Sequence, residues 1–494
     1  MVCALATLIC LFVGFGGATA LFSDSDAGWH IRNGESILAN RALPLTDTFS
    51  FSKNGAPWIA WEWGADVLMG AVHRVAGLDG VACLFGLGIG AAVWMWFRLN
   101  WAAGGSFPLA AVFAVPMITT SSIHWLARPH VFGWLFLIAT VWWCEKAGCE
   151  KVPMRLTAGG ACVIALASAA WANLHGSFVL GPAILLIYAG GAGLAVALWG
   201  VQRPVAPYLL GALAAVLGSL LNPYGWRLHQ HVLAYLTDSA LLRRVGEFQS
   251  FDFHSAGAGW VIAALCIGLV GGAAALSIQR PERLLLALAM TAAALVSARS
   301  LPLAALVLLP LANGSITEVL SLAGGLRPRL RRQLDRALIY SERLRAFDRT
   351  LHGLALVPLA AVLLFASIRG HAAFPAGQIP VAAAERIASL AANARIFSTD
   401  KFGGYLIYRF SAGRPVFFDG RSDFYGVNFV DRYARMFEAR PSWKEEFEHW
   451  NFTHALLPPD APLVAALEAS GWHELYRDRT AVLLAGQQTP REGS

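Results

Sequence analysis

Long apolar runs separated by short polar stretches extend along the chain as far as residue 368. Runs such as Val81–Phe97, Val205–Leu221 and Trp260–Ser277 approach the roughly 17–25 residues that a helix needs to cross the hydrocarbon core of a bilayer. The pattern predicts about eleven membrane-spanning helices, at residues 2–21, 79–97, 106–122, 130–144, 156–172, 177–199, 205–221, 259–278, 284–299, 301–319 and 351–368.

The first predicted span could also be a signal peptide, because it ends in Ala18-Thr19-Ala20. No Lys or Arg precedes its apolar run, and a basic start is typical of signal peptides. A retained first helix is therefore favoured.

The pattern changes after residue 368, where short strand-like runs alternate with helical ones. Strands are predicted at Ala394–Thr399, Pro415–Asp419 and His454–Leu457, and a hairpin at Trp472–Tyr476 with Ala481–Leu484. Such alternation is typical of a small α/β layer domain. The helices predicted between these strands cover residues 384–393, 430–439, 442–450 and 463–470. The fold class is thus an all-α polytopic membrane bundle over residues 1–368, followed by an α/β domain over residues 369–494.

Basic residues gather in alternate loops of this arrangement, most densely in a loop at about 320–350 with eight arginines from Arg327 to Arg349. Cytoplasmic loops of membrane proteins carry such an excess. The N-terminus and this loop are therefore predicted to be cytoplasmic, and the first outside loop (about 22–78) and the C-terminal domain to lie on the opposite, exoplasmic side. The basic loop is interpreted as a topology determinant with an amphipathic surface helix; a lipid-binding or nucleic-acid-binding patch is the alternative.

Composition agrees with a membrane protein. The chain is 56% hydrophobic and 14% charged, with a mean hydropathy of +0.53, whereas an average soluble domain has about 25% charged residues. The net charge of +7 does not indicate a nucleic-acid partner, because the surplus lies in helix flanks and in one loop, as the topology rule predicts.

Polar and ionisable residues collect on the predicted exoplasmic side, several of them at helix ends. Such groups are costly at membrane depth and usually face a cavity or one another, so their gathering indicates a functional site. The set comprises Asp24, Asp26, His30, Asp47, Glu62, His124, Arg128, His130, Asn173, His175, Asn222, Glu247, Asp252, His254 and Arg299.

Asp24 and Asp26 directly follow the first predicted span. Two carboxylates so placed could hold a divalent cation or supply a general base. His30 lies four residues after Asp26 and would share a face with it if a helix starts there. The structural alternative is that Asp26 is an N-cap, which explains one carboxylate but not the pair.

Other segments offer binding residues, each with a structural alternative. Glu62 lies among three Trp residues, either contacting a ligand or within an interfacial amphipathic segment. Arg128, before a proline, could bind a phosphate or extend to the membrane interface. Asn173 and His175 flank an interruption between apolar runs that could bind a ligand or pack helices.

In the C-terminal domain, Asp419 and Arg421 are predicted to pair across a loop at a strand end. In the membrane part, Asn222-Pro-Tyr-Gly225 has the composition of a turn. A Walker motif, a G-x-S-x-G elbow and a C-x-x-C pair are all absent from the sequence.

Several of these motifs together resemble a group of largely uncharacterised bacterial membrane proteins described as GT-C-like glycosyltransferases, and the resemblance spans nearly the whole chain. It is carried by Asp24-x-Asp26…Trp29-His30, Pro44…Asp47-Thr-Phe-Ser50, Trp58…Glu62-Trp63, Arg128-Pro129, Asn173-x-His175-Gly176, Asn222-Pro-Tyr-Gly225 and Phe418-Asp-Gly-Arg421.

The resemblance implies a core bundle shared with that superfamily, an acidic residue in the first outside loop, and donors that are sugars on a polyprenyl phosphate. It also implies a bacterial inner (plasma) membrane with the C-terminal domain in the periplasm. The chain has Asp-Ser-Asp where related mannosyl- and arabinosyltransferases commonly have an Asp-Glu pair, which leaves open which Asp is the base and whether a metal is used.

The expected activity is inverting transfer of a hexose or pentose to an acceptor hydroxyl, with Asp24 or Asp26 as base and nearby cations stabilising the departing phosphate. No cofactor is certain; Mg²⁺ or Mn²⁺ on Asp24 and Asp26 stays open. Expected partners are membrane lipid, the lipid-linked sugar, and a glycan, lipid or protein acceptor. The candidate binding residues are His30, Glu62, Arg128, His130, Asn173, His175, Glu247 and Arg299.

Two other functions fit the same pattern. One is a lipid-linked oligosaccharide ligase or polymerase, which moves a whole glycan. The other is a non-enzymatic transporter or envelope-assembly protein, since charged groups at membrane depth also mark transport pathways.

Overall fold

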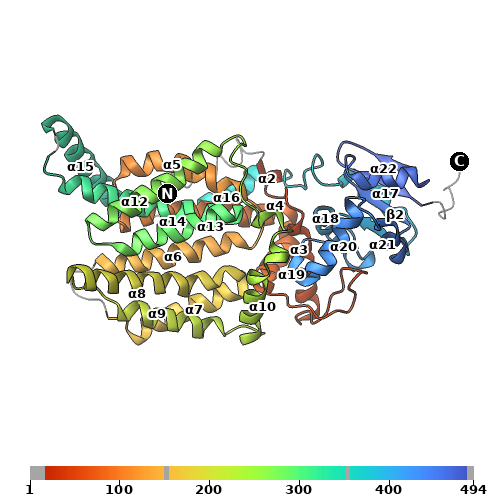
Figure 1. Cartoon of the computed structure of the whole chain (residues 1–494), viewed down its shortest axis with the longest axis horizontal. Helices are drawn as coiled ribbons and strands as arrows, with labels where there is room; N and C mark the ends of the chain where they lie inside the picture. Colours follow the sequence, from red (N-terminus) through yellow and green to blue (C-terminus); the bar gives the residue numbers. More distant parts are fainter. Residues whose placement is uncertain (1–16, 150–154, 326, 351–356, 487–494) are drawn as a thin grey trace.

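The computed structural model describes residues 17–149, 155–325, 327–350 and 357–486, and it consists of a helical bundle with a smaller domain at one end (Figure 1). A helix overlaps each of the nine spans predicted between residues 79 and 319. Residues 2–16 of the predicted span 2–21 and residues 351–356 of the predicted span 351–368 lie outside the described residues. The bundle helices are α4 (Trp63–Ala102), α5 (Phe107–Ser121), α6 (His130–Cys149), α7 (Ala158–Leu174), α8 (Leu180–Trp199), α9 (Ala206–Ser219), α12 (Ala258–Ser277), α13 (Pro281–Val296), α14 (Leu301–Leu322) and α16 (Val357–Ile368).

Shorter elements connect these helices. They are α2 (Gly17–Ala20), α3 (Asp26–Asn40), α10 (Trp226–Thr237), α11 (Ser239–Leu242), and the 3-10 helices η1 (Ser122–His124), η2 (Gly176–Val179), η3 (Gly246–Phe248) and η4 (Ala298–Ser300). Of these, α2, α3 and α10 lie at the end near the C-terminal domain (Figure 1). The arginine-rich segment forms α15 (Pro328–Thr350), which lies at the end of the bundle opposite the C-terminal domain (Figure 1).

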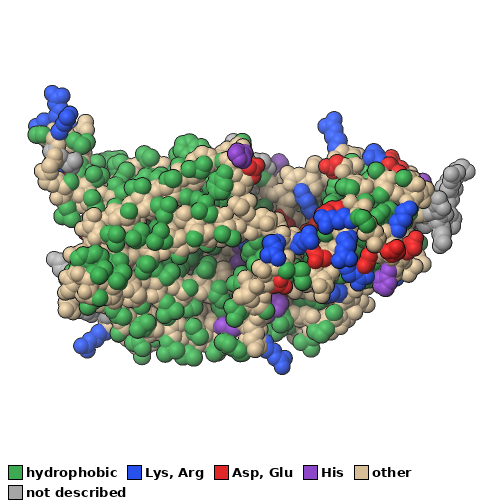
Figure 2. All heavy atoms as spheres, viewed as in Figure 1, with side chains coloured by type: hydrophobic (Ala, Val, Ile, Leu, Met, Phe, Trp, Pro, Cys, Tyr) green, Lys and Arg blue, Asp and Glu red, His purple; other side chains and the backbone are tan. Residues whose placement is uncertain are grey.

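The surface of the bundle is that of a multi-pass membrane protein. Five helical segments within the described residues are long and apolar enough to cross a membrane, and α7 and α9 are shorter apolar helices. Apolar side chains cover the bundle, whereas charged ones gather on the C-terminal domain and at the far end (Figure 2). On α9, Leu210, Leu213 and Leu217 are each more than half exposed, which suits contact with lipid better than contact with water. The total of eleven spans stays a prediction.

Helix α4 begins sixteen residues before the predicted start of its span at residue 79, so the first outside loop is shorter than expected. Hydropathy missed this part because it carries Asp66, His73 and Arg74. A kink at Ala76 and Gly77, where Gly77 has φ 58°, separates it from the apolar part. It packs tightly on α3, since a Cβ on Gly34 would lie 1.7 Å from the Asp66 carbonyl oxygen.

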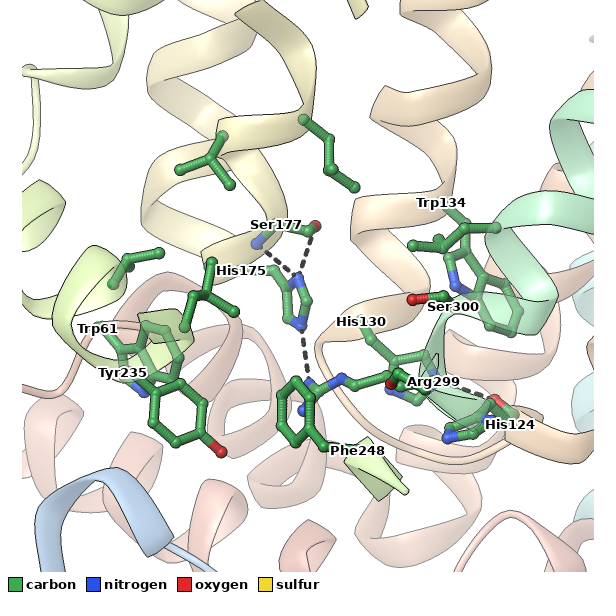
Figure 3. A pocket seen from close by; sticks show the side chains of 17 residues that line it. Trp61, His124, His130, Trp134, His175, Ser177, Tyr235, Phe248, Arg299 and Ser300 are labelled. Carbon is green, nitrogen blue, oxygen red and sulfur yellow. Dashed lines mark hydrogen bonds between the residues drawn. The ribbon is translucent and has the colours of Figure 1, made fainter. Parts of the chain in front are cut away.

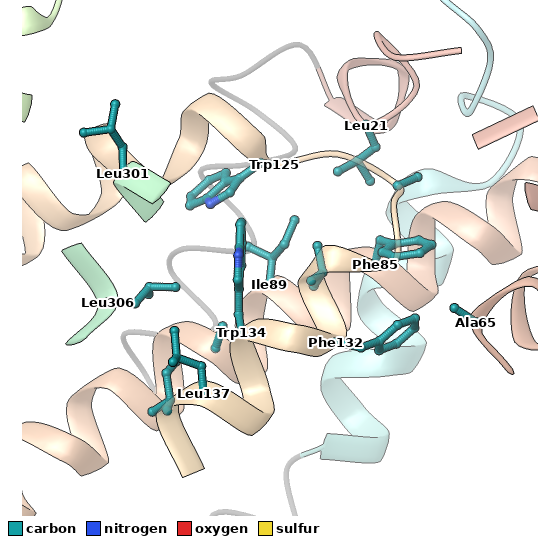
Figure 4. Packing of buried hydrophobic residues seen from close by; sticks show 14 of the residues in the cluster. Leu21, Ala65, Phe85, Ile89, Trp125, Phe132, Trp134, Leu137, Leu301 and Leu306 are labelled. Atoms are coloured by element: carbon teal, nitrogen blue, oxygen red, sulfur yellow. The ribbon is translucent and has the colours of Figure 1, made fainter. Parts of the chain in front are cut away.

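The buried core of the bundle also fixes two polar loops beside each other. Leu21 and Trp125 pack into the same cluster as Phe85 of α4 (Figure 4). The Ala127 N–H donates a hydrogen bond of 2.7 Å to the Leu21 carbonyl oxygen. The segment that follows Leu21 therefore runs next to the segment that follows Ala127.

The C-terminal domain contains a four-stranded sheet in the order β1-β2-β4-β3. β1 (Ile396–Ser398) pairs in parallel with β2 (His454–Leu457), and β4 (Val482–Ala485) is antiparallel to both β2 and β3 (His473–Arg477). The predicted α/β character and the β3–β4 hairpin are confirmed. The helices are α17 (Val381–Ala388), α18 (Asp400–Phe410), α19 (Ser422–Tyr425), α20 (Val427–Phe437), α21 (Trp443–His449) and α22 (Pro462–Ala469), with the 3-10 helix η6 (Ser411–Gly413).

One predicted strand of this domain is wrong. Pro415–Asp419 does not join the sheet; Val416 instead forms an isolated bridge to Ser50 of the first outside loop. The Val416 N–H donates to the Phe49 carbonyl oxygen and the Phe51 N–H donates to the Val416 carbonyl oxygen, each at 2.9 Å. The strand-like segment at Val416 thus pairs with the first outside loop and joins the C-terminal domain to the bundle.

Helix α18 was not predicted, because Gly403 and Gly404 lower its helix propensity. The structure shows why small residues stand there. A Cβ on Gly404 would lie 2.5 Å from the Ser25 carbonyl oxygen, and a Cβ on Gly28 would lie 2.3 Å from the Gly404 carbonyl oxygen. Backbones of α18 and α3 therefore touch, which holds the domain against the first outside loop.

Candidate active site

Two adjoining cavities lie where the bundle meets the C-terminal domain. One, of about 400 Å³, is polar and is lined by residues of the first loop, the loop before α6, the loop around η3 and the C-terminal domain. The other, of about 180 Å³, lies among bundle helices and has mainly aromatic and aliphatic walls (Figure 3). Tyr235 and Arg299 line both cavities, so these two residues mark the border between a polar and an apolar compartment.

Three carboxylates meet at one guanidinium group in the polar cavity. Arg128 Nη1 lies 2.6 Å from Asp24 Oδ2 and also bonds Glu247, while Nη2 lies 3.0 Å from Asp26 Oδ2. The bond between Ala127 and Leu21 places Arg128 beside the Asp pair. Two acidic residues that are two positions apart thus share one arginine that lies about a hundred residues later in the chain.

A second guanidinium continues the network toward the apolar cavity. Arg299 Nη1 lies 3.1 Å from Glu247 Oε2, and Nη2 lies 3.4 Å from His175 Nε2. The Arg299 guanidinium also lies over the Phe248 ring, 5.5 Å from its centroid. The Ala298 N–H donates to the Gln249 carbonyl oxygen at 2.8 Å, so the loops that carry Arg299 and Glu247 are joined directly.

Behind the cavities, a buried chain of polar residues supports this layer. His175 Nε2 lies 3.4 Å from Glu62 Oε1, and His30 Nε2 lies 3.8 Å from Glu62 Oε2. His30 Nδ1 lies 2.6 Å from Asp66 Oδ1, a partner that sequence reasoning missed because Asp66 seemed to belong to the loop. His30 and Glu62 line neither cavity, so they position the layer in front of them.

Burial and neighbouring charges shift the pKa values of the ionisable groups in the site in different directions. Burial, followed by repulsion from Asp24, raises the pKa of Asp26 well above its ordinary value. Burial would also raise the pKa of Glu247, but Arg128 and Arg299 outweigh it and hold that pKa well below its ordinary value. Burial lowers the pKa of His30 to about 3. Asp26 is therefore a carboxyl able to hold a proton, Glu247 is a fixed anion, and His30 is neutral.

The N-cap position of α3 is Ser25, which makes no side-chain cap bond, and the carboxylate that accepts an N–H at the helix start is that of Asp24. Asp24 Oδ1 accepts the Asp26 N–H at 2.9 Å, while its Oδ2 faces Arg128. Asp26 is the first residue of the helix, so the interpretation of Asp26 as the N-cap is wrong.

The C-terminal domain closes the polar cavity through the loop Phe418-Asp-Gly-Arg421. A Cβ on Gly420 would lie 2.0 Å from Asp26 Oδ1, so this backbone lies directly against the Asp26 carboxylate. The domain also contributes Asp400, Lys401 and Ser422 to the lining. Sequence reasoning missed these three residues, because nothing in their local pattern connects them with the first loop.

The predicted pair of Asp419 and Arg421 is confirmed, and it is part of a larger buried cluster. Arg421 Nε and Nη2 lie 2.8 and 2.7 Å from the two Asp419 carboxylate oxygens, and Nη1 lies 2.8 Å from Asp47 Oδ1. The guanidinium also lies 4.6 Å from the centroid of the Trp58 ring. A single arginine thus joins the domain to the first outside loop.

Other residues singled out from the sequence lie apart from the cavities or at their edge. The Asn173 amide accepts the Trp63 indole N–H at 2.8 Å and donates to the carbonyl oxygens of Ala169 and Leu221; it packs helices and lines neither cavity. His130 lines the apolar cavity, with Nε2 2.8 Å from the His124 carbonyl oxygen (Figure 3).

Three further residues of the predicted exoplasmic set, Asp252, His254 and Asn222, also lie outside both cavities. Asp252 and His254 are exposed and line neither cavity. Asn222 Oδ1 accepts the Tyr224 N–H at 2.8 Å, as its turn composition indicated.

A divalent cation does not fit the residues as they stand. Within the described ranges, no group of three or more His, Cys, Asp or Glu side chains is arranged to hold a metal ion. Asp24 and Asp26, the residues proposed for such an ion, direct carboxylate oxygens at the Arg128 guanidinium instead.

Comparison with known proteins supports the fold. No protein-family model and no curated protein matches the sequence. Among solved structures, the archaeal oligosaccharyltransferase AglB of Archaeoglobus fulgidus, in complex with an inhibitory peptide and a dolichol-phosphate, matches over 99% of this chain and 74% of its own, with 13% identity and a TM-score of 0.54.

Two further structures of the Archaeoglobus fulgidus oligosaccharyltransferase agree. The one tethered to an acceptor peptide covers 92% of this chain and 68% of its own at 13% identity, with a TM-score of 0.53. The one in complex with Zn and sulfate covers 92% of this chain and 67% of its own at 13% identity, with a TM-score of 0.52. The chain therefore shares its fold with these oligosaccharyltransferase structures over most of its length. That it belongs to a bacterial family stays a prediction.

Proposed function

We propose that this protein is an inverting membrane glycosyltransferase, which moves a sugar from a polyprenyl-phosphate donor to an acceptor hydroxyl. One observation carries the proposal: a polar cavity with paired carboxylates adjoins an apolar cavity, and Arg299 lines both. A donor with a sugar, a phosphate and an isoprenoid tail has the same order of polar, charged and apolar parts. The AglB structure with a dolichol-phosphate supports the match of this fold to such a lipid.

The donor phosphate is assigned to Arg299 and His175. The Arg299 guanidinium carries a fixed positive charge and, at 27% side-chain exposure, is accessible from both cavities. His175 Nε2 lies 3.4 Å from it. The isoprenoid units next to the phosphate would pack on the walls of the apolar cavity, which include Trp134, Leu180 and Leu303. The sugar would then lie in the polar cavity.

Asp26 is assigned as the general base. Its raised pKa makes it a better proton acceptor than an ordinary carboxylate, whereas both oxygens of Asp24 already accept hydrogen bonds. Asp26 takes the proton of the acceptor hydroxyl as that oxygen forms a bond to the anomeric carbon. The bond from this carbon to the phosphate oxygen breaks, and its electron pair leaves with the polyprenyl phosphate. One displacement inverts the anomeric configuration.

Charge develops on the departing phosphate, and Arg299 is placed to stabilise it. Hydrogen-bond donors that are already in position before the reaction stabilise a developing charge without having to reorganise. Arg299 is held by Glu247 and by the Phe248 ring, so its position does not depend on the substrate.

The acceptor is proposed to enter beside the C-terminal domain, where Lys401 and Ser422 line the polar cavity. A glycan, a lipid or a protein could supply the hydroxyl. The proposed site is at the opposite end of the bundle from the arginine-rich helix α15 (Figure 1). With α15 in the cytoplasm, the reaction takes place at the periplasmic face of a bacterial inner membrane.

Transfer of a whole glycan is the second candidate. It is favoured by the fold similarity, which extends over the bundle and the C-terminal domain of an oligosaccharyltransferase. A donor carrying one sugar and a donor carrying an oligosaccharide, offered to the same preparation, separate the two: the first candidate requires turnover of the single-sugar donor.

The test of the proposal uses purified protein in nanodiscs, lipid-linked sugar donors and a mixture of envelope acceptors. Asp26→Asn should lower turnover by roughly 10²- to 10⁴-fold, the usual contribution of a general base, and Asp24→Asn should lower it less. Asp335→Asn, on the exposed face of α15, is the matched control and should leave turnover unchanged. Wild-type turnover in Asp26→Asn would overturn the assignment of the base, and wild-type turnover in both Asp26→Asn and Asp24→Asn would overturn the catalytic role of the pair.

A further inference from the structure

We infer that the Arg128 guanidinium is the resident cation of the polar cavity and stands in the place of a divalent metal ion. The inference rests on the proposed function for its meaning in catalysis, but its geometric part stands alone. Its starting observation is that three carboxylates, from the first loop and from the loop at η3, all contact one guanidinium group.

The directions of these contacts fit a guanidinium. Its N–H donors lie in one plane and point outward in a fixed fork. Nη1 serves Asp24 and Glu247 on one side, and Nη2 serves Asp26 on the other. A divalent Mg²⁺ or Ca²⁺ instead takes about six or more oxygens at about 2.0–2.6 Å around one point, and the described residues offer no such group.

Two of the remaining carboxylate oxygens already have partners. Asp24 Oδ1 accepts the Asp26 N–H, and Glu247 Oε2 faces Arg299 at 3.1 Å, while Asp26 Oδ1 lies close to the Gly420 backbone. Turning Asp24 or Glu247 toward a metal would break one of these contacts.

Charge leads to the same conclusion. Against the two guanidinium groups of Arg128 and Arg299, the three carboxylates leave one net negative charge when all are ionised and none when Asp26 holds a proton. A divalent ion added here would turn the cavity positive within a few ångströms of both arginines, where burial weakens screening. The ion would therefore have to displace Arg128.

The backbone of Arg128 is held by hydrogen bonds, which place the start of its side chain beside the Asp pair. The Ala127 N–H donates to the Leu21 carbonyl oxygen, and the Arg128 N–H donates to the Leu126 carbonyl oxygen at 2.9 Å. Pro129 follows and fixes its own φ. Arg128 is thus a positioning residue: it orients Asp24 and Asp26 and supplies the positive charge that a metal would otherwise bring.

The experiment measures Mn²⁺ binding by electron paramagnetic resonance and, in parallel, turnover with and without EDTA, on the full chain in nanodiscs. The wild type should bind no stoichiometric Mn²⁺, and EDTA should leave its turnover unchanged. One bound Mn²⁺ that Asp24→Asn or Glu247→Gln abolishes would overturn the inference, and so would loss of turnover in EDTA that Mn²⁺ restores. If no preparation turns over a lipid-linked sugar, the proposed function fails. The Mn²⁺-binding measurement still shows whether the cavity holds a metal ion or only the Arg128 guanidinium.

Variants of Arg128 test whether its guanidinium is what keeps a metal ion out of the cavity. Arg128→Ala should lower turnover by at least a hundredfold and should gain a Mn²⁺ site, because Asp24 and Asp26 lose their cation and Glu247 loses one of its two. Arg128→Lys should stay free of Mn²⁺ and retain more turnover than the alanine variant. Arg244→Ala, whose side chain pairs with Asp431 and lines neither cavity, should match the wild type. A folded Arg128→Ala protein without a Mn²⁺ site would contradict the claim that the guanidinium takes the place of the ion.

Discussion

Replacing Arg299 by alanine tests the assignment of the donor phosphate most directly. Arg299 is the only arginine that lines both cavities among the residues the structure describes, so its loss removes the cation at their border. A hydrogen bond to a charged group contributes about 1.5–3 kcal/mol. Since about 1.4 kcal/mol corresponds to a tenfold change in affinity, the dissociation constant for polyprenyl phosphate should rise by roughly 10- to 150-fold.

The fold should survive this change. Glu247 loses one partner but keeps Arg128, so no buried carboxylate is left unpaired. The Arg299–Glu247 pair is about one-quarter exposed on each side, and partly exposed pairs contribute about 1 kcal/mol or less to stability. A loss of binding can therefore be separated from unfolding.

The assay is titration of a fluorescent polyprenyl phosphate into nanodisc-embedded protein. Arg299→Lys keeps the charge but not the fork and should give an intermediate dissociation constant. Arg244→Ala serves as the matched arginine control and should bind as the wild type does. A dissociation constant for Arg299→Ala equal to that of the wild type would refute the assignment, and the phosphate would then have to lie elsewhere.

Three further outcomes are expected. Burial raises the pKa of Asp26, so kcat/KM should fall as the pH drops through that raised pKa; a profile that stays flat down to about pH 4, the ordinary range of an aspartate, would contradict its role as base. Arg421→Ala leaves two buried carboxylates without their cation and should lower the free energy of unfolding by about 3–5 kcal/mol, seen as a drop in melting temperature that Arg477→Ala, on an exposed pair, does not show. Gly420→Ala brings a Cβ to 2.0 Å from Asp26 Oδ1 and should reduce turnover by roughly a hundredfold with little change in melting temperature, whereas Gly413→Ala, which meets nothing within 4 Å, should be silent.

The parts of the fold that the sequence predicts well are those set by local pattern. An apolar run long enough to cross a bilayer is a helix whatever its neighbours are, because its backbone polar groups must be satisfied within the segment. The hairpin of β3 and β4 and the strand β2 were likewise recognisable. Where the local signal is mixed, prediction failed: the charged start of α4 was assigned to the loop, and α18 was hidden by its two glycines.

The sequence alone also determined which residues gather at one end of the bundle, because alternating spans place every second loop on the same side. The sequence alone did not determine which of these residues contact one another. The meeting of Asp24, Asp26 and Glu247 at Arg128, and the approach of Gly420 to Asp26, depend on how helices far apart in the chain pack and on where the C-terminal domain docks. Pairing energies of this kind depend on distance and burial, and both exist only once the tertiary structure has formed.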